Sequence, residues 1–139
     1  MKSLANFFWI AALGAAIVFS MAGCASAPAE TGTVALTVNP GPNQSVIVIQ
    51  RQSQMAGAII PMDVWVDGEK VGPSIPNGGT AQIIIPNGEH SIHAGSSNAD
   101  RGKEIKFSVN GEAIFFSAKP QMGILSARFS LTQTGKRRL

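Results

Sequence analysis

The stretch Met62-Asp63-Val64-Trp65-Val66-Asp67-Gly68-Glu69-Lys70-Val71 decides the fold. Its two short β-rich runs are joined by Asp67-Gly68, a dipeptide that tolerates positive φ and closes two-residue hairpin turns. Period-two alternation places Val64 and Val66 on one face, so we expect a hairpin in which the valines pack together. Turn dipeptides of the same kind recur along the chain, at Asn77-Gly78, Asn87-Gly88 and Asn110-Gly111.

Between these turns nearly every segment is short and rich in Val, Ile, Thr or Phe, and no helical periodicity follows the N-terminal region. We expect strands at 33–38, 46–52, 62–66, 70–71, 80–85, 90–94, 103–109, 112–118 and 125–132. About seven to nine short strands are typical of an all-β domain, here an antiparallel Ig-like β-sandwich, with a small barrel as the alternative. A chain of 139 residues has room for one such domain, which we place at 33–133.

For one hairpin the sequence also predicts which residues lie opposite each other. The turn at Asn110-Gly111 would pair Phe107 with Ile114 and Ile105 with Phe116 on neighbouring strands of the segment 103–118. All four apolar side chains would then lie on one face, as a half-buried sheet requires.

A longer pattern supports the same fold. The stretch VWVDGEKVG at 64–72 is followed by Ile75-Pro76-Asn77-Gly78 and by IIPNGEHSI at 84–92. This succession resembles the V-x-V-D-G-x-x-V-G … N-G … P-x-G-x-H-x-I pattern of PEGA-like β-sandwich domains and of a related group of uncharacterised bacterial lipoproteins. The resemblance spans about residues 46–94. It implies a β-sandwich that serves as an envelope module and carries no catalytic residues.

The first residues are typical of a lipoprotein signal peptide. Lys2 precedes an apolar run from Phe7 to Ala22, which is short for a membrane-spanning helix and suits a secretory signal. The run ends Met21-Ala22-Gly23-Cys24, which resembles a bacterial lipobox with Met where Leu is usual. The resemblance implies that residues 1–23 are cleaved and that the Cys24 thiol is acylated, which would hold the protein to membrane lipid. Ala25 follows instead of Asp, which favours the outer over the inner membrane of the cell envelope.

Two short segments flank the expected domain. Residues 24–32 comprise the lipidated Cys24 and small polar residues with Pro and Gly, which predicts a flexible tether. Residues 134–139, TGKRRL, predict a frayed basic tail. Three cations of this tail account for the formal net charge of +3, so the rest of the chain offers no basic face for nucleic acid.

Motifs for catalysis, metals and cofactors are missing from the sequence. Only one Cys and two His are present, and His90 and His93 fall on opposite faces of one expected strand, so they cannot chelate one ion. No nucleophile elbow, zinc-protease helix, phosphate loop or dinucleotide fingerprint occurs. Asp63 and Asp67 would lie about 13 Å apart along a strand, too far for a glycosidase carboxylate pair. We therefore expect no catalytic residue, no metal and no cofactor.

Binding is the class of function that remains. If the valines of 62–66 fill the core, Trp65 is exposed between Asp63 and Asp67, and this trio could stack on and hydrogen-bond a sugar. Two apolar loops, 56–61 and 122–125, either cover the core or form a patch for a protein partner. The sequence predicts a non-enzymatic binding or assembly module with an envelope protein as its partner. The alternative is a carbohydrate- or peptidoglycan-binding lipoprotein that uses Trp65.

Overall fold

The computed structural model describes residues 34–97, 99–122 and 127–139, so the predicted signal peptide, Cys24 and the tether lie outside the described residues. The described chain is all-β, as expected, and contains no helix. Its eight strands are β1 (Gln44–Arg51), β2 (Met62–Val66), β3 (Glu69–Ile75), β4 (Thr80–Pro86), β5 (Gly88–Gly95), β6 (Ile105–Val109), β7 (Glu112–Met122) and β8 (Ala127–Arg138).

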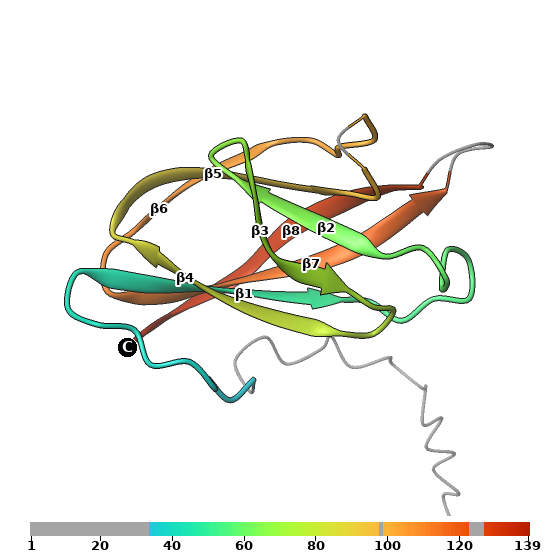
Figure 1. Cartoon of the computed structure of the whole chain (residues 1–139). Coiled ribbons are helices and arrows are strands. Elements are labelled where there is room, and N and C mark those ends of the chain that lie inside the picture. The colour runs from blue at the N-terminus through green and yellow to red at the C-terminus, as the bar shows by residue number, and fades with distance from the viewer. Residues whose placement is uncertain (1–33, 98, 123–126) are drawn as a thin grey trace, which may run out of the picture.

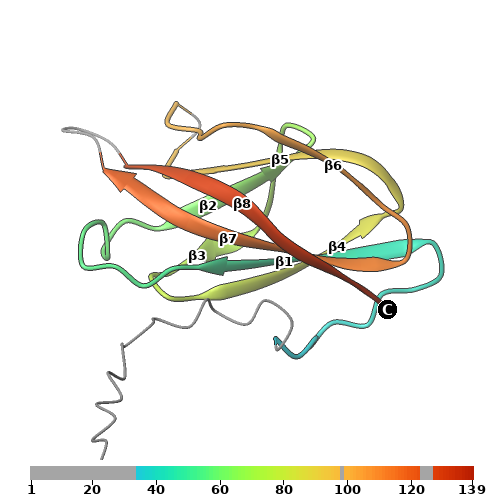
Figure 2. The same cartoon turned by 180° about the vertical axis from the view of Figure 1, so that it is seen from behind.

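All eight strands belong to one sheet in the order β3-β2-β5-β8-β7-β1-β4, with β6 paired to β5 beside this path. The sheet curls back on itself, so that β2, β3, β5 and β6 face β1, β4, β7 and β8 across the core (Figure 1), and the view from behind shows the same arrangement (Figure 2). β5 and β8 meet at one residue pair, Ala94 and Phe129. This narrow bridge joins the two groups into a mixed sheet that is nearly barrel-shaped.

The β2–β3 hairpin forms as predicted. Val64 lies opposite Val71 and Val66 lies opposite Glu69. Asp67 has a φ of 52° and Gly68 a φ of 87°, so both central residues of the turn are left-handed. This is the geometry of a type I′ turn, whose twist matches that of the strands it joins.

The expectation of a purely antiparallel sheet is wrong. β1 runs parallel to β7, with Ile47 opposite Ile114 and Ile49 opposite Phe116. β1 lies between β4 and β7, and its residues 46–49 are at most 1% exposed. A strand that is buried on both faces has a continuous apolar sequence, so the alternation that would mark its register is absent.

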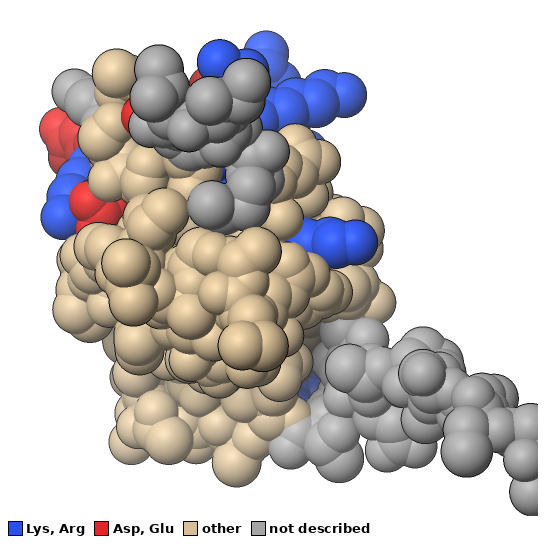
Figure 3. All heavy atoms as spheres, turned by 90° about the vertical axis from the view of Figure 1, so that its right-hand side faces the viewer, with Lys and Arg blue, Asp and Glu red and all other residues tan. Residues whose placement is uncertain are grey.

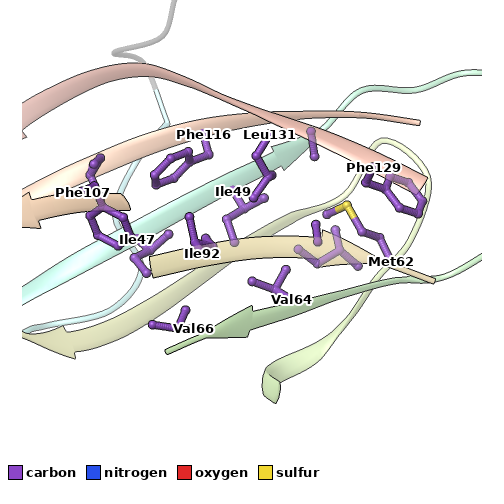
Figure 4. Close-up of a cluster of buried hydrophobic side chains, with 14 of the residues drawn as sticks. Ile47, Ile49, Met62, Val64, Val66, Ile92, Phe107, Phe116, Phe129 and Leu131 are labelled. Carbon is purple, nitrogen blue, oxygen red and sulfur yellow. The ribbon is translucent and has the colours of Figure 1, made fainter. Parts of the chain in front are cut away.

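The main core lies between the two groups of strands (Figure 4). It takes alternate side chains from the facing strands, including Ile47, Ile49, Met62, Val64, Val66, Ile92, Phe107, Phe116, Phe129 and Leu131. Burial of each large apolar side chain contributes about 1.5–3 kcal/mol. A second cluster lies on the outer face of β1 and β7 and contains Val34, Leu36, Val38, Val46, Val48, Ala113 and Phe115.

The predicted hairpin between β6 and β7 does not form, because β6 pairs with β5 while β7 pairs with β1 and β8. The turn at Gly111 carries the chain across the core, and Phe107 meets Phe116 edge-on with 5.5 Å between ring centroids. The four apolar side chains predicted to share one face of a hairpin therefore lie on two strands that face each other across the core. The buried hydroxyl of Ser45 fixes this corner by accepting a hydrogen bond from the Glu112 N–H at 3.1 Å.

Residues 34–38, expected within the strand 33–38, form no strand and pair with no described strand. The side chain of Gln82 in β4 takes the place of a neighbouring strand. Its Oε1 accepts from the Thr37 N–H at 2.7 Å, and its Nε2 donates to the Ala35 carbonyl at 2.8 Å. Because one side-chain amide satisfies two backbone groups, this segment stays on the sheet without a ladder of its own.

The frayed basic tail expected at 134–139 is also wrong, because residues 134–138 complete β8 alongside the start of β7. Lys136 Nζ lies 3.4 Å from the Glu112 carboxylate. The Arg137 guanidinium carbon lies 5.5 Å from the centroid of the Phe115 ring. Pairing of β8 with β7 thus places Lys136 and Arg137 beside partners, although the sequence predicted a frayed tail.

Candidate functional site

The structure separates the three residues predicted to bind a ligand. Trp65 is only 5% exposed. Asp63 lies 3.0 Å from the ammonium of Lys70, whereas Asp67 is paired with His90. Each carboxylate therefore has its own partner, and the expected exposed aromatic platform between them is not formed.

Trp65 is covered by the segment that leads from β5 to β6. Its indole stacks on the His93 ring with 5.6 Å between centroids, and the Arg101 guanidinium carbon lies 4.9 Å from the indole centroid. Burial and the charge of Arg101 lower the pKa of His93, while Glu104, 4.0 Å away, acts in the opposite direction. A sugar would reach the indole only after Arg101 had moved.

Two glycines allow this covering segment to approach the sheet. A Cβ on Gly102 would lie 2.0 Å from the Phe129 carbonyl oxygen, and one on Gly95 would lie 2.3 Å from that of Asp100. The Gly102 N–H donates to the Ala94 carbonyl at 2.8 Å. Any larger side chain at residue 102 would push the segment away from β8.

A shallow groove of about 470 Å³ opens beside the β2–β3 turn and is lined by Asp67, Glu89, His90, Ser91, Glu104, Lys106 and Phe107. His90 Nδ1 lies 2.7 Å from Asp67 Oδ2, and His90 Nε2 lies 2.8 Å from the Pro86 carbonyl. Both facing atoms are acceptors, so both ring nitrogens carry protons in this arrangement. Burial alone lowers the pKa of His90, but the hydrogen bonds to Asp67 and Pro86 outweigh it and raise the pKa above its usual value.

The carboxylate of Asp67 is equally committed. One oxygen faces His90 and the other accepts the Ser91 N–H at 2.8 Å, and these two hydrogen bonds lower the pKa of Asp67. A histidine with both N–H groups engaged cannot accept a proton as a general base. This pair holds the turn against β5 and does not resemble an acid–base centre.

Arg51, which belongs to none of the predicted sites, organises one end of the molecule. It ends β1 and is 1% exposed. Its guanidinium donates to the carbonyls of Ile60 at 2.7 Å, Gly57 at 2.8 Å and Ile75 at 2.9 Å. Its carbon also lies 4.9 Å from the centroid of the Phe129 ring. Burial lowers the pKa of Arg51, yet an arginine stays charged under these conditions.

Two of these carbonyls belong to the loop 52–61, which Arg51 therefore holds in place. The Ile60 N–H also donates to the Gly57 carbonyl at 3.0 Å. The loop presents Met55 at 98% and Ile59 at 95% exposure, whereas Ile60 packs against the core. The predicted apolar loop 56–61 thus covers the core through Ile60 and exposes Ile59, and Met55 is exposed just before it. The side chains of the second predicted loop, 122–125, lie outside the described residues.

The loop and a segment that it meets carry no charge. Residues 52–62 and 71–88 contain no Asp, Glu, Lys or Arg. The two stretches meet where the Arg51 N–H donates to the Gly79 carbonyl at 2.9 Å and the Gln54 N–H donates to Asn77 at 3.0 Å. Figure 3 views the end of the molecule that carries the loop, and uncharged atoms fill its centre while charged side chains lie at its upper and side edges.

The signal for this site was present in the sequence. Arg51 is the one charged residue between residues 34 and 62. An isolated cation that ends a fully apolar strand is expected to be buried with acceptors or to mark the strand's exit from the core. The carbonyls that Arg51 binds depend on how the loop folds, and no local sequence pattern predicts that fold.

No family model matches the chain, and no curated protein matches it either. One solved structure that matches is that of a DUF3823 family protein from Parabacteroides merdae, with a TM-score of 0.36 and 12% sequence identity. The match covers 67% of this chain and 60% of the other, so this chain spans about 60% of that protein's length.

No group of three or more His, Cys, Asp and Glu side chains that could hold a metal ion occurs among the described residues. None of their segments forms a helix long and apolar enough to cross a membrane.

Proposed function

We propose that this chain is a lipid-anchored protein of the bacterial envelope that acts as a non-enzymatic binding or assembly module. The observation that carries the binding role is the loop 52–61, where Met55 and Ile59 are 98% and 95% exposed on a braced backbone. The motif that ends at Cys24 supports the lipid anchor, and Ala25 after it supports the outer membrane. The partner we propose is another envelope protein.

A braced apolar loop is suited to recognition. Burying Arg51 costs free energy, which its hydrogen bonds to the loop carbonyls offset. Because the loop is ordered before a partner arrives, less conformational entropy is lost on binding. Met55 is unbranched and adapts to an irregular socket. The uncharged stretches 52–62 and 71–88 favour a partner with an apolar pocket over one with a charged face.

The pair formed by His90 and Asp67 supports the non-enzymatic role. His90 has hydrogen-bond acceptors at both nitrogens, and both oxygens of Asp67 accept hydrogen bonds. Neither group is available to take a proton from a substrate.

We also propose that the fold is a PEGA-like β-sandwich. The β2–β3 hairpin with its Asp67-Gly68 turn supports this assignment, as does the arrangement of the strands in two facing groups. An experimentally determined structure tests it through the β5–β8 bridge. Absence of the Ala94–Phe129 pairing supports two separate sheets, and an extended β5–β8 ladder contradicts them.

The docking role is tested by photo-cross-linking in cells that make the full chain. A photoreactive amino acid replaces Met55 or Ile59, and Glu69 on the exposed β2–β3 turn serves as the control position. We expect both loop positions to form the same covalent adduct with one envelope protein and Glu69 to form none. The proposal is overturned if the loop positions yield no protein adduct, or if all three positions yield the same one.

The anchor is tested separately with Cys24→Ser. We expect this variant to stay unprocessed or to leave the membrane fraction, because it has no thiol for the lipid. An unchanged mass and an unchanged membrane fraction would contradict the anchor without touching the docking role.

A further inference from the structure

The exposed edges of the sheet are protected unequally. β3, at one end of the strand order, is interrupted by Gly72, whose φ is 65°, and by Pro73. β6 is short, contains Lys106, and has its Ser108 carbonyl bonded by Lys136 at 2.5 Å. Proline, irregular backbone and lysine are devices that keep an edge from pairing with another chain.

β4, at the other end of the strand order, has none of these devices before its last residue, Pro86. It pairs with β1 on one side, and no described strand pairs with its other side. Its sequence, TAQIIIP, contains no charge, and its single proline is the last residue. Figure 1 shows β4 at the rim of the curled sheet. An uncharged, regular edge strand is a template for further pairing.

The hydrogen bonds between β1 and β4 show which backbone groups point outward. The Arg51 N–H donates to the Gly79 carbonyl at 2.9 Å, and the Asn87 N–H donates to the Asn43 carbonyl at 3.0 Å. Bonded pairs alternate along an antiparallel ladder, so every second residue of β4 between these points is bonded to β1. The remaining residues direct their N–H and C=O groups to the open edge, and these are Thr80, Gln82 and Ile84.

Both ends of this edge are closed. Pro86 has no N–H, and its carbonyl is bonded by His90 Nε2 at 2.8 Å. At the other end the chain enters β4 from a turn, in which the Gly79 N–H donates to the Pro76 carbonyl at 2.9 Å. The open edge is therefore limited to three outward-facing residues with Gln82 at its centre.

We propose that this edge pairs antiparallel with β4 of a second copy of the chain, about a two-fold axis at Gln82. In that register Gln82 lies opposite Gln82 of the second copy, and Thr80 lies opposite Ile84 of the second copy. Each opposed pair exchanges two backbone hydrogen bonds, so about six form. Because Thr80 and Ile84 are placed symmetrically about Gln82, this register leaves none of the outward backbone groups of the three residues unpaired.

The charge distribution favours a second copy as the occupant. A two-fold contact brings each residue on the axis against itself, so any charge there would meet its like. Residues 71–88 carry no charge, and Ile84, at 39% exposure, gains an apolar contact with the methyl group of Thr80. The proposed pairing of β4 with a second copy does not depend on the loop 52–61, which lies on a different segment of the chain.

The register is tested by disulfide cross-linking of the full chain in the membranes of expressing cells. Opposed residues of a bonded pair have Cα atoms about 5.5 Å apart, within the range of a disulfide. The double variant Thr80→Cys/Ile84→Cys should therefore form linked dimers on oxidation. Each single variant places its two thiols about 13 Å apart, so we expect about tenfold less dimer from either one. The wild-type chain controls for Cys24.

The mass of the detergent-extracted full chain is a second measurement that needs no cysteine. We expect a dimer for the wild type, a monomer for Ile84→Lys, and a dimer for the control Ile59→Lys, which adds the same charge at the exposed loop. A folded wild-type monomer at about 10 μM, well above the dissociation constants of stable complexes, overturns the proposal. So do equal cross-linking of the single and double variants, and linkage of the double variant to a different protein only.

Discussion

His90 and Asp67 form an ion pair in which Nδ1 and Oδ2 are 2.7 Å apart, while the second ring nitrogen is 2.8 Å from the Pro86 carbonyl. The pair joins the β2–β3 turn to β5 and to the end of β4. Because both acceptors favour the protonated ring, the pKa of His90 is raised in the folded protein. The ion pair is thus a pH-dependent part of the fold.

We predict that His90→Gln destabilises the protein more in mild acid than in alkali. A raised folded pKa contributes stability in full below the unfolded value of about 6.5, and that contribution is lost as pH rises through the folded pKa. The difference in unfolding free energy between wild type and His90→Gln should therefore be larger at about pH 5.5 than at about pH 9. Urea denaturation at the two pH values measures it.

His93→Gln is the matched control with the opposite sign. Burial lowers the pKa of His93, so its contribution to stability is present above about pH 6.5 and is lost on acidification. Equal pH dependence of the two variants would contradict both assignments. A ring titration by NMR that places the pKa of His90 below that of His93 would do the same.

Local sequence pattern predicted eight of the nine expected strands and one hairpin, but it did not predict which strands pair. The strand expected at 33–38 does not form in the described residues 34–38. The Asp67-Gly68 turn fixed the β2–β3 hairpin because both residues accept positive φ. The Asn110-Gly111 turn predicted a hairpin equally well, but the chain crosses the core there. Whether the chain forms a hairpin or crosses the core at this turn depends on how well β6 packs along the edge of β5. The sequence of the turn does not predict that packing.

The candidate site was likewise only partly predictable from the sequence. Alternation put Trp65 on the outer face of β2, but that face is covered by the segment carrying Arg101. The bonds of Arg51 and Gln82 to distant carbonyls are side-chain substitutes for backbone pairing. Such contacts have no periodicity, so they become visible only when the fold is known.

We predict that Arg51→Met destabilises the protein by about 3 kcal/mol, because it leaves three carbonyls without their buried donor. The amides of the loop 52–61 should also exchange faster, and hydrogen exchange with urea denaturation measures both effects. Arg128→Met, at an exposed position of β8, is the control and should change neither. Loop exchange that stays at the wild-type rate would show that Arg51 does not brace the loop.

We predict that Gly102→Ala destabilises the protein by about 2 kcal/mol or more, since an unrelieved core clash costs that much. Its Cβ would lie 2.0 Å from the Phe129 carbonyl oxygen, so the covering segment must move. The second tryptophan of the chain is Trp9, in the predicted signal peptide. In a Trp9→Phe background, which removes its signal from any unprocessed chain, the emission of Trp65 should shift to the red. Gly41→Ala is the control, because its Cβ meets only the flexible end of Gln44. An unshifted emission with full stability contradicts the close approach.

We predict that Gln82→Ala releases residues 34–38 from the outer face of the sheet. The variant loses the acceptor of the Thr37 N–H and the donor to the Ala35 carbonyl, which should cost about 1–2 kcal/mol and speed exchange of the Thr37 amide. Gln52→Ala, which removes one exposed hydrogen bond to Ser117, is the control.

Gln82→Glu separates the two halves of this contact. A carboxylate still accepts from the Thr37 N–H but places a negative oxygen against the Ala35 carbonyl, so it should fail to restore wild-type exchange. Rescue by Glu would mean that one bond alone holds the segment. The proposed β4 pairing uses backbone groups of Gln82, so Gln82→Ala should remain a dimer while residues 34–38 are released. Loss of both together would show that the segment, and not the strand edge, makes the contact between copies.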